Sequence, residues 1–540
     1  MTTTTRLALG FAIGLIVARE MRRLRLRWTW AATALVFVVC VRSDLGGQVW
    51  TPGIAAFFAT VRGRRWHRED VEAGADLAEI AARRRGPLEA LLSLARKLDL
   101  RRGGLAPDGL LHGDRLIVGR EENGEPVSIP LGDSRGGRHT LVVGATGSGK
   151  TVTATWIATR AIAGGMGVVA IDPKGDGRMR AELARSAQAC GRPFIPWTPD
   201  GPSVYNPYTR GEATEIADKA LAGERFTEPH YQRQAQRYLG YEVRALRGVG
   251  LEVSLKALVE YLDPARLEVL ARSLPEERAA ATHEYLDSLT SRQQSDLSGV
   301  RDRLSIMAES DFAAWLDPRT PGAEPFNLIE AVRERAVVYF DLQADSRPLL
   351  AQMLGVAIVI DLQTTVAALQ GRPTPTLAII DEFSAIAAEQ VTRLFGRARS
   401  AGVSLLLGTQ EFSDLRLAGR EMVLEQVLGN LSSLIAHRQI VPDSADLVAR
   451  LAGSRGVWKT SHSSDGRWTR TRASAPLIRA ELVRYLPDGC AAVIELSGHS
   501  TVRVARMFSP ASSRVTGSSL AARLGARVSR AIASARAHDR

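Results

Sequence analysis

The stretch Gly144-Ala145-Thr146-Gly147-Ser148-Gly149-Lys150-Thr151 decides the fold of this chain. It fits G-x-x-x-x-G-K-[ST] at every fixed position, with an apolar run at Thr140–Val143 before it and a helix-compatible stretch at Thr151–Ala163 after it. The glycines let backbone N–H groups surround a phosphate, and the positive end of the helix adds to the attraction. Lys150 reaches the β- and γ-phosphates, and the Thr151 hydroxyl holds Mg²⁺. The sequence therefore predicts a strand, a phosphate loop and a helix that bind ATP and Mg²⁺.

A second motif places two carboxylates directly after an apolar run. Asp381 and Glu382 follow Leu377–Ile380, where the end of a parallel strand would face the nucleotide. In this position Asp381 would hold Mg²⁺ through water, and Glu382 would polarise the attacking water. An apolar run followed by two acidic residues is by itself more typical of a core strand and its turn. The phosphate loop in the same chain favours the catalytic interpretation.

Two further residues are candidates for contact with the γ-phosphate. Gln410 follows the run Val403–Leu407, and a glutamine at a strand end can sense the γ-phosphate or orient water; a turn glutamine is the alternative. Arg399 lies before this run, near the end of the preceding helical stretch. It could act as an arginine finger on the nucleotide of a neighbouring subunit. Arg393 and Arg397 are rivals for that role, and a solvated helix arginine is the simpler reading of Arg399 alone.

Strand-like runs alternate with helical stretches on both sides of a long helical segment. This alternation predicts an α/β fold, a P-loop ATPase core with a mainly parallel sheet. Residues 212–330 contain almost no strand-like run, and their apolar residues recur at helical spacing. We therefore expect six segments, which are a membrane anchor region (1–68), a helical stem or linker (69–110), a first part of the core (111–211), an all-α insertion domain (212–330), a second part of the core (331–510) and a basic tail (511–540).

The N-terminal region carries a membrane signal. Apolar runs occur at Leu7–Ala18, Trp28–Val41 and Val49–Val61, each shorter than the roughly 20 residues of a spanning helix. The second and third runs could extend into their connector as a tight hairpin, and arginines flank this pair on both sides. The positive-inside rule then places both flanks in the cytoplasm. The sequence predicts an anchor in the inner cell membrane with a cytoplasmic ATPase domain; a buried soluble hairpin is the alternative.

Composition points to an anionic partner. The formal net charge is +12 and the isoelectric point is about 10.0, which suits nucleic acid or a membrane surface. The basic tail 511–540 could touch DNA or lipid headgroups, although a solvated tail is the simpler interpretation. Three widely spaced cysteines form no disulfide framework and no zinc motif, so a reducing compartment is expected.

Residues Val457–Arg472 combine cations with aromatic side chains around a hairpin turn signal, Asp465-Gly466. This composition suits tracking of a phosphate backbone and stacking on bases, and it predicts non-specific binding of DNA. A plain exposed hairpin is the alternative, because charge runs are usually solvated. The candidate residues for DNA contact are Trp458, Lys459, His462, Arg467, Trp468, Arg470 and Arg472.

Several motifs in fixed order carry a family resemblance. The phosphate loop is followed by AIDPKGD (170–176), VYNPYTRG (204–211), VVYFDLQA (337–344), IIDEFSAI (379–386), RSAGVSLLLGTQ (399–410) and GNLSSLIAHR (429–438). Over residues 111–510 the chain resembles the type IV secretion coupling proteins, TraD/TraG-like DNA-translocating ATPases of the FtsK/HerA superfamily.

The resemblance implies a RecA-like core in a membrane-anchored homo-hexameric motor. Such motors bring relaxase-bound DNA or protein substrates to the proteins of a secretion channel. The family's arginine finger falls on Arg399 and its sensing glutamine on Gln410, and its all-α domain selects substrates. The basic tail departs from the acidic tails that many coupling proteins have.

Two other classes of function remain open. An FtsK-like chromosome-segregation translocase would not need the inserted segment between Lys150 and Asp381, and no winged-helix-like appendage is evident at the C-terminal end. A non-motor membrane scaffold would tolerate a degenerate nucleotide site, but Lys150, Asp381 and Glu382 are intact.

Overall fold

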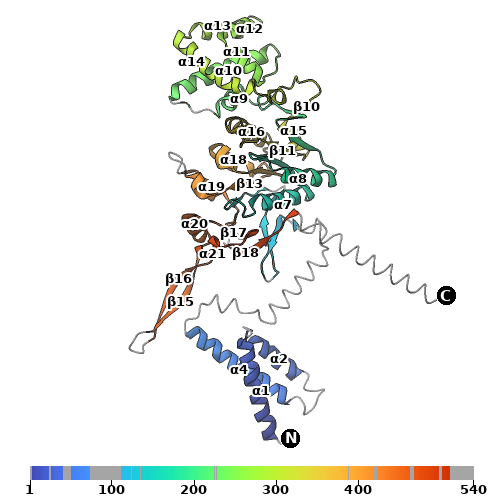
Figure 1. Cartoon of the computed structure of the whole chain (residues 1–540), viewed down its shortest axis with the longest axis vertical. Coiled ribbons are helices and arrows are strands. Elements are labelled where there is room, and N and C mark those ends of the chain that lie inside the picture. The colour runs from blue at the N-terminus through green and yellow to red at the C-terminus, as the bar shows by residue number, and fades with distance from the viewer. Residues whose placement is uncertain are drawn as a thin grey trace, which may run out of the picture. The chain divides into compact units, whose positions relative to one another are not determined.

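The computed structural model describes residues 3–23, 26–40, 50–72, 111–112, 114–122, 124–133, 136–223, 226, 228–386, 388–416, 422–462, 468–497 and 501–510. The chain divides into two compact units. The first contains the N-terminal helices and a hairpin, and the second contains the sheet and most of the helices (Figure 1). The stem from residue 73, the turn 463–467 with Arg467, and the tail 511–540 lie outside the described residues.

The second unit is built on a twelve-stranded sheet. From β14 to β8 the strand order is β14-β6-β13-β12-β7-β11-β8, and every neighbouring pair in this run is parallel. The bounds are β6 Thr140–Val143, β7 Gly167–Asp172, β8 Phe194–Trp197, β11 Val337–Asp341, β12 Thr376–Ile380, β13 Val403–Thr409 and β14 Ser433–Ala436. This confirms the expected α/β core with a mainly parallel sheet.

An antiparallel extension completes the sheet beyond β14. β17 pairs with β14 and β18, and β18 pairs with β2, which also pairs with β1 and β3. A separate two-stranded piece, β4 with β5, precedes β6. The bounds are β1 Leu111–His112, β2 Arg115–Arg120, β3 Pro126–Pro130, β4 Gly132–Asp133, β5 Gly136–Gly137, β17 Cys490–Glu495 and β18 Thr501–Met507.

Helices cover the parallel strands. All residues of β6, β7, β11, β12 and β13 are buried, and because neighbouring side chains point to opposite faces, both faces are covered. The helices of this core are α7 Lys150–Ala163, α8 Gly177–Ala189, α15 Leu328–Arg333, α16 Pro348–Ala368, α17 Phe383–Ile386, α18 Ala388–Ala398, α19 Met422–Asn430, α20 Pro442–Ala452, α21 Ala480–Arg484 and the short η4 Phe412–Leu415.

The predicted insertion is helical from α9 to η3. Figure 1 shows α9–α14 grouped beyond the sheet. Its elements are α9 Ala213–Leu221, α10 Pro229–Gly248, α11 Leu255–Tyr261, α12 Pro264–Ala271, α13 Glu276–Asp287, α14 Ser291–Ala308 and η3 Ala313–Leu316. The chain leaves along β9 (Ser203–Tyr205) and returns along β10 (Glu324–Phe326), which pairs with β9 in parallel. The helical part thus ends before residue 330, and the division into six segments stays a prediction.

Helix α16 is long and apolar enough to cross a membrane, and no other described helix meets that test. However, 67% of its apolar window Ala351–Ala368 is buried within the protein. It packs against α9, α15, α17 and α18. Since its apolar surface already has protein partners, α16 is a core helix of the second unit.

The N-terminal helices α1 (Thr3–Arg23), α2 (Thr29–Cys40) and α4 (Trp50–Glu72) pack through small residues. A Cβ added at Gly10 would lie 2.7 Å from Ile54 Cγ2, so α1 and α4 approach closely. Ala18, Ala31 and Ala59 form the buried cluster between the helices. Large apolar side chains are exposed instead, namely Leu7, Ile16, Val36, Phe37, Val39 and Phe57. Small residues inside and large apolar residues outside are typical of helices packed in lipid.

Candidate nucleotide site

The phosphate loop connects β6 to α7, as the sequence predicts. Gly147 and Gly149 have φ of 78° and 112°, a region that side-chain-bearing residues rarely adopt. Lys150 begins α7, and its Nζ donates to the Gly144 carbonyl oxygen at 2.6 Å. Its ammonium group therefore contacts the first residue of the phosphate loop. Thr151 follows in the first turn of the same helix. A glycine-bearing loop between a strand and a helix, with a lysine and a hydroxyl at the helix start, fits a nucleoside triphosphate with Mg²⁺.

Two neighbouring segments support the backbone of this loop. Ala145 N–H donates to the Arg438 oxygen at 2.9 Å, and Gly489 N–H donates to the Ser148 oxygen at 3.0 Å. His437, at the end of β14, lies between them, and its Nε2 is 3.0 Å from a threonine hydroxyl on α7. Burial lowers the pKa of His437 to about 4, so the ring is neutral at neutral pH. The loop conformation is therefore fixed from both sides.

Asp381 and Glu382 lie at the end of β12, beside the end of β13. A small cavity at the sheet edge is lined by Lys150, Asp381 and Gly408, which brings the lysine and the first carboxylate together. Burial, with the nearby charges of Asp172 and Glu382, raises the pKa of Asp381 to about 6. Neighbouring carboxylates disfavour the ionised form of this half-buried carboxyl, and a cation such as Mg²⁺ would relieve that repulsion, so Asp381 is a fitting ligand for one.

Glu382 is the centre of a hydrogen-bond chain. Its backbone has a φ of 46°, unusual for a residue with a side chain. Gln410 Nε2 donates to both carboxylate oxygens of Glu382, at 2.8 and 2.9 Å. Thr146 of the phosphate loop donates through Oγ1 to Gln410 Oε1 at 3.1 Å. The structure therefore connects the phosphate loop, the glutamine after β13 and the carboxylate after β12.

Lys174, after β7, completes this chain and was not among the predicted site residues. Its Nζ donates to Glu382 Oε1 at 2.7 Å. The loop that carries it folds around Asp172, whose carboxylate accepts from the backbone N–H groups of Lys174, Gly175 and Asp176 and from the Tyr339 hydroxyl. The signal available in the sequence was Asp172-Pro173-Lys174-Gly175-Asp176 at the end of a buried strand, as at Asp381.

Arg399 is not brought together with these residues. It follows α18 and precedes β13, so it lies at the opposite end of β13 from Gln410. Its backbone oxygen accepts from Gly137 N–H at 2.9 Å, before β6 begins, and its charge contributes to lowering the pKa of His139 there. Arg399 is exposed at the edge of the sheet that is remote from its own phosphate loop.

The predicted DNA hairpin forms as β15 (Ser454–His462) and β16 (Trp468–Pro476). Trp458 pairs with Arg472, and positions 460 and 462 pair with Arg470 and Trp468. Because directly paired strand positions have their side chains on the same face, Trp458 and Arg472 share one face of the ribbon. Trp458 and Arg472 are exposed. The structure therefore places Trp458 and Arg472, two of the predicted residues, on the same face.

A buried ion pair joins the all-α insertion to the core. Lys219 on α9 is fully buried, and its Nζ donates to Asp361 Oδ1 on α16 at 2.6 Å. The Tyr205 hydroxyl donates to the other oxygen of Asp361 at 2.7 Å. Two backbone oxygens accept the remaining hydrogens of Lys219. The pair is fully hydrogen-bonded, which is the condition under which buried charges are tolerated.

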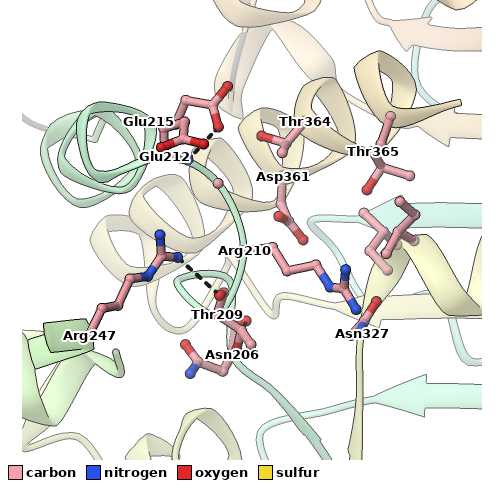
Figure 2. Close-up of a pocket in the computed structure, with 14 residues that line it drawn as sticks. Asn206, Thr209, Arg210, Glu212, Glu215, Arg247, Asn327, Asp361, Thr364 and Thr365 are labelled. Atoms are coloured by element: carbon pink, nitrogen blue, oxygen red, sulfur yellow. Dashed lines mark hydrogen bonds between the residues drawn. The ribbon is translucent and has the colours of Figure 1, made fainter. Parts of the chain in front are cut away.

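A cavity of about 520 Å³ opens beside this pair (Figure 2). The cavity is lined by the loop after β9, by α10, by the start of α15 and by the end of α16. Arg247 extends toward the loop and donates to the Thr209 oxygen at 3.4 Å, while Arg210 pairs with Glu330 at 2.7 Å. Glu212 and Glu215 line the same space, so both signs of charge are present.

The fold and the site define a P-loop protein of the ATPase class. Residues 125–486 match the model of a family described as the type IV secretion-system coupling protein DNA-binding domain. The match spans well over half of the chain, so this chain belongs to the type IV secretion coupling protein family.

Solved structures agree in fold. The chain is similar to the bacterial conjugative coupling protein TrwBdeltaN70 (19% identity, 74% of this chain and 93% of that chain, TM-score 0.55). It is similar to TrwB in complex with the GTP analogue GDPNP (19% identity, 74% and 94%, TM-score 0.53). VirB4 of Thermoanaerobacter pseudethanolicus is more distant (14% identity, 74% and 98%, TM-score 0.50). An uncharacterized protein of Mycoplasma pneumoniae is 34% identical over 104 residues, 19% of this chain and 69% of that protein.

Proposed function

We propose that this protein is a membrane-anchored, ATP-driven motor that couples DNA, as a relaxase–DNA complex, or protein substrates to a type IV secretion or conjugation channel. The observation that carries the proposal is the hydrogen-bond chain from Thr146 through Gln410 to Glu382. It links the loop that would hold the phosphates to the carboxylate that would act on water.

The roles of the site residues follow from their positions. Lys150 and Thr151 hold the phosphates and Mg²⁺, together with the backbone of the loop Gly144–Gly149. Asp381 would hold the cation through water, and Glu382 would accept a hydrogen bond from the attacking water. Mg²⁺, when bound, neutralises charge on the phosphates. Gln410 orients Glu382 and stands where it can sense the γ-phosphate.

A homo-hexameric ring would bring Arg399 to a neighbouring subunit's nucleotide. Support comes from its place at the sheet edge remote from its own phosphate loop, where it is exposed. An arginine supplied by a neighbour stabilises the charge that develops during phosphoryl transfer.

The anchor of this motor would be α1, α2 and α4 in the inner cell membrane, with the ATPase body in the cytoplasm. Their exposed large apolar residues and small buried residues support a lipid environment. The hairpin face that includes Trp458 and Arg472 would contact DNA without sequence preference, as cations and aromatic rings do along a backbone.

ATP hydrolysis by the purified full-length protein tests the proposal. Lys150→Ala should abolish turnover, and Glu382→Gln should bind ATP without hydrolysing it. Lys256→Ala, at an exposed lysine of α11, is the matched control and should hydrolyse ATP at the unaltered rate. Turnover at the unaltered level in either site variant would contradict the assignment.

A further inference from the structure

We propose that Lys174 is a positioning residue that exchanges partners with the nucleotide state: it holds Glu382 when no γ-phosphate is present and moves to the γ-phosphate when ATP binds. The exchange would free Glu382 to accept a hydrogen bond from the attacking water. The inference rests on the proposed ATPase function and assigns a role to a residue of the loop after β7.

The carboxylate of Glu382 is occupied in the observed arrangement. Lys174 Nζ lies 2.7 Å from Oε1, and Gln410 Nε2 lies within 2.9 Å of both oxygens. Three contacts on two oxygens occupy about three of the four lone-pair positions, and the Lys174 ammonium also neutralises the charge of the carboxylate. Loss of Lys174 would therefore make Glu382 a better acceptor for the attacking water.

Lys174 is the partner that can leave. Its side chain is 46% exposed, whereas that of Glu382 is 15% exposed. The backbone beneath it is fixed, because Asp172 accepts from the N–H groups of Lys174 and Gly175. A flexible four-carbon stem on a fixed base lets the ammonium swing without any change in the loop. Gln410, in contrast, is held at its other end by Thr146.

The phosphate region lies within the electrostatic reach of Lys174. The charge of Lys174 is among the causes that lower the pKa of Lys150, and both lysines feel Asp381 and Glu382. Two ammonium groups therefore share the same pair of carboxylates. Burial acts to lower the pKa of Lys174, but its hydrogen bond and charge interaction with Glu382 raise it, so Lys174 stays protonated. A γ-phosphate offers more negative charge and more acceptor oxygens than one carboxylate.

A purely structural role explains this geometry less well. An ion pair with one half-exposed partner adds little to stability, because water competes for both groups. The Lys174–Glu382 pair also occupies the carboxylate that the proposed hydrolysis requires. This arrangement is compatible with hydrolysis if the pair separates during the reaction.

Equilibrium binding tests the exchange without measuring turnover. The probes are ADP and the β,γ-imido analogue of ATP, with Mg²⁺, on the full-length protein. In Lys174→Ala the preference for the analogue over ADP should fall about tenfold, as for the loss of one charge-assisted contact, with ADP affinity unchanged. Lys174→Arg should keep most of the preference, because the charge remains. Unchanged ADP affinity shows that the variant is folded.

A double-mutant cycle sharpens the test. Glu382→Ala should increase the preference for the analogue, because Lys174 no longer has a competing partner, and adding Lys174→Ala should remove that gain. If Lys174→Ala keeps the preference of the unaltered protein, Lys174 only aligns Glu382 and the exchange is wrong. If the unaltered protein binds neither probe, the proposed ATPase function itself fails, which is a different result.

Discussion

Glu242, on α10 of the all-α insertion, is a fully buried carboxyl whose two oxygens have no hydrogen-bond partner among the described residues. Burial raises the pKa of Glu242 well above its ordinary value of 4.5. When the pKa of a carboxyl is higher in the folded than in the unfolded state, the free energy of unfolding is highest at a pH below the unfolded-state pKa. It falls as the pH rises through that pKa, because the unfolded chain ionises and the folded chain does not.

We therefore expect the insertion to lose stability as the pH rises above the ordinary glutamate pKa of 4.5, because the unfolded chain ionises there while the folded carboxyl stays protonated. Glu242→Gln should remove most of this pH dependence, and Glu242→Met should raise the unfolding temperature at pH 8 because no polar group stays buried. Thermal unfolding of the three proteins as a function of pH is the measurement. Glu284→Gln, at an exposed glutamate of α13, should behave like the unaltered protein. A pH dependence that survives in Glu242→Gln would assign the effect to another group.

At the scale of single elements, the hairpin β15–β16 is proposed to contact DNA through one of its two faces, the face that carries Trp458 and Arg472. Removal of one phosphate contact should reduce the slope of log affinity against log salt by about one unit. Arg472→Ala should show this for every DNA sequence alike, because a phosphate contact carries no sequence information. Trp458→Ala should weaken the binding of single-stranded DNA more than that of duplex DNA, by about 1–3 kcal/mol, since stacking needs an unpaired base.

Arg455→Ala supplies the control for this experiment. Arg455 pairs with Ala475, which places it on the other face of the same ribbon from Arg472. The proposed contact requires a larger effect at Arg472 than at Arg455, measured by DNA binding over a series of salt concentrations. Equal effects at both positions would mean that the charge of the ribbon acts without a defined face.

The strands were the part of the fold that the sequence predicts best. β6 coincides with its run Thr140–Val143, β12 begins one residue before the run Leu377–Ile380, and β13 extends two residues beyond the run Val403–Leu407. Strands buried on both faces require continuous apolar residues, so the run defines the strand. The three-residue strands β9 and β10 have no such run, and they pair with each other outside the large sheet.

Contacts between strand ends were predictable only in part. The acidic end of β12 and the glutamine after β13 carry their own signals, and the structure places Glu382 and Gln410 in contact. The contact with Lys174 depends on β7 being the other neighbour of β12, which the order of the chain does not reveal. Local patterns identify strands, but the order of strands in the sheet decides which loops meet.

At the scale of the whole molecule, the position of Arg399 predicts that activity requires assembly. β13 has 7 residues, about 20 Å, between Arg399 and Gln410, so Arg399 cannot reach the nucleotide of its own chain. Arg399→Ala and Lys150→Ala should each be inactive alone. Mixed assemblies should regain ATP hydrolysis, because the Lys150→Ala subunit supplies an intact arginine to an intact phosphate loop.

The measurement is turnover after co-assembly at varied ratios of the two variants. A mixture of Lys150→Ala with Glu382→Gln is the control and should stay inactive, because each defect lies within its own site. If the first mixture also stays inactive although the variants co-assemble, Arg399 does not act between subunits.

The parallel pair β9–β10 has a consequence for how such a protein can change over evolutionary time. The chain enters and leaves the helical block through two strands that lie side by side and are only three residues long. An exchange of the block for another of different size would leave the order of the large sheet intact, provided that the new block kept a buried lysine for Asp361. Recombination could thus replace this block as a cassette while the motor stayed unchanged.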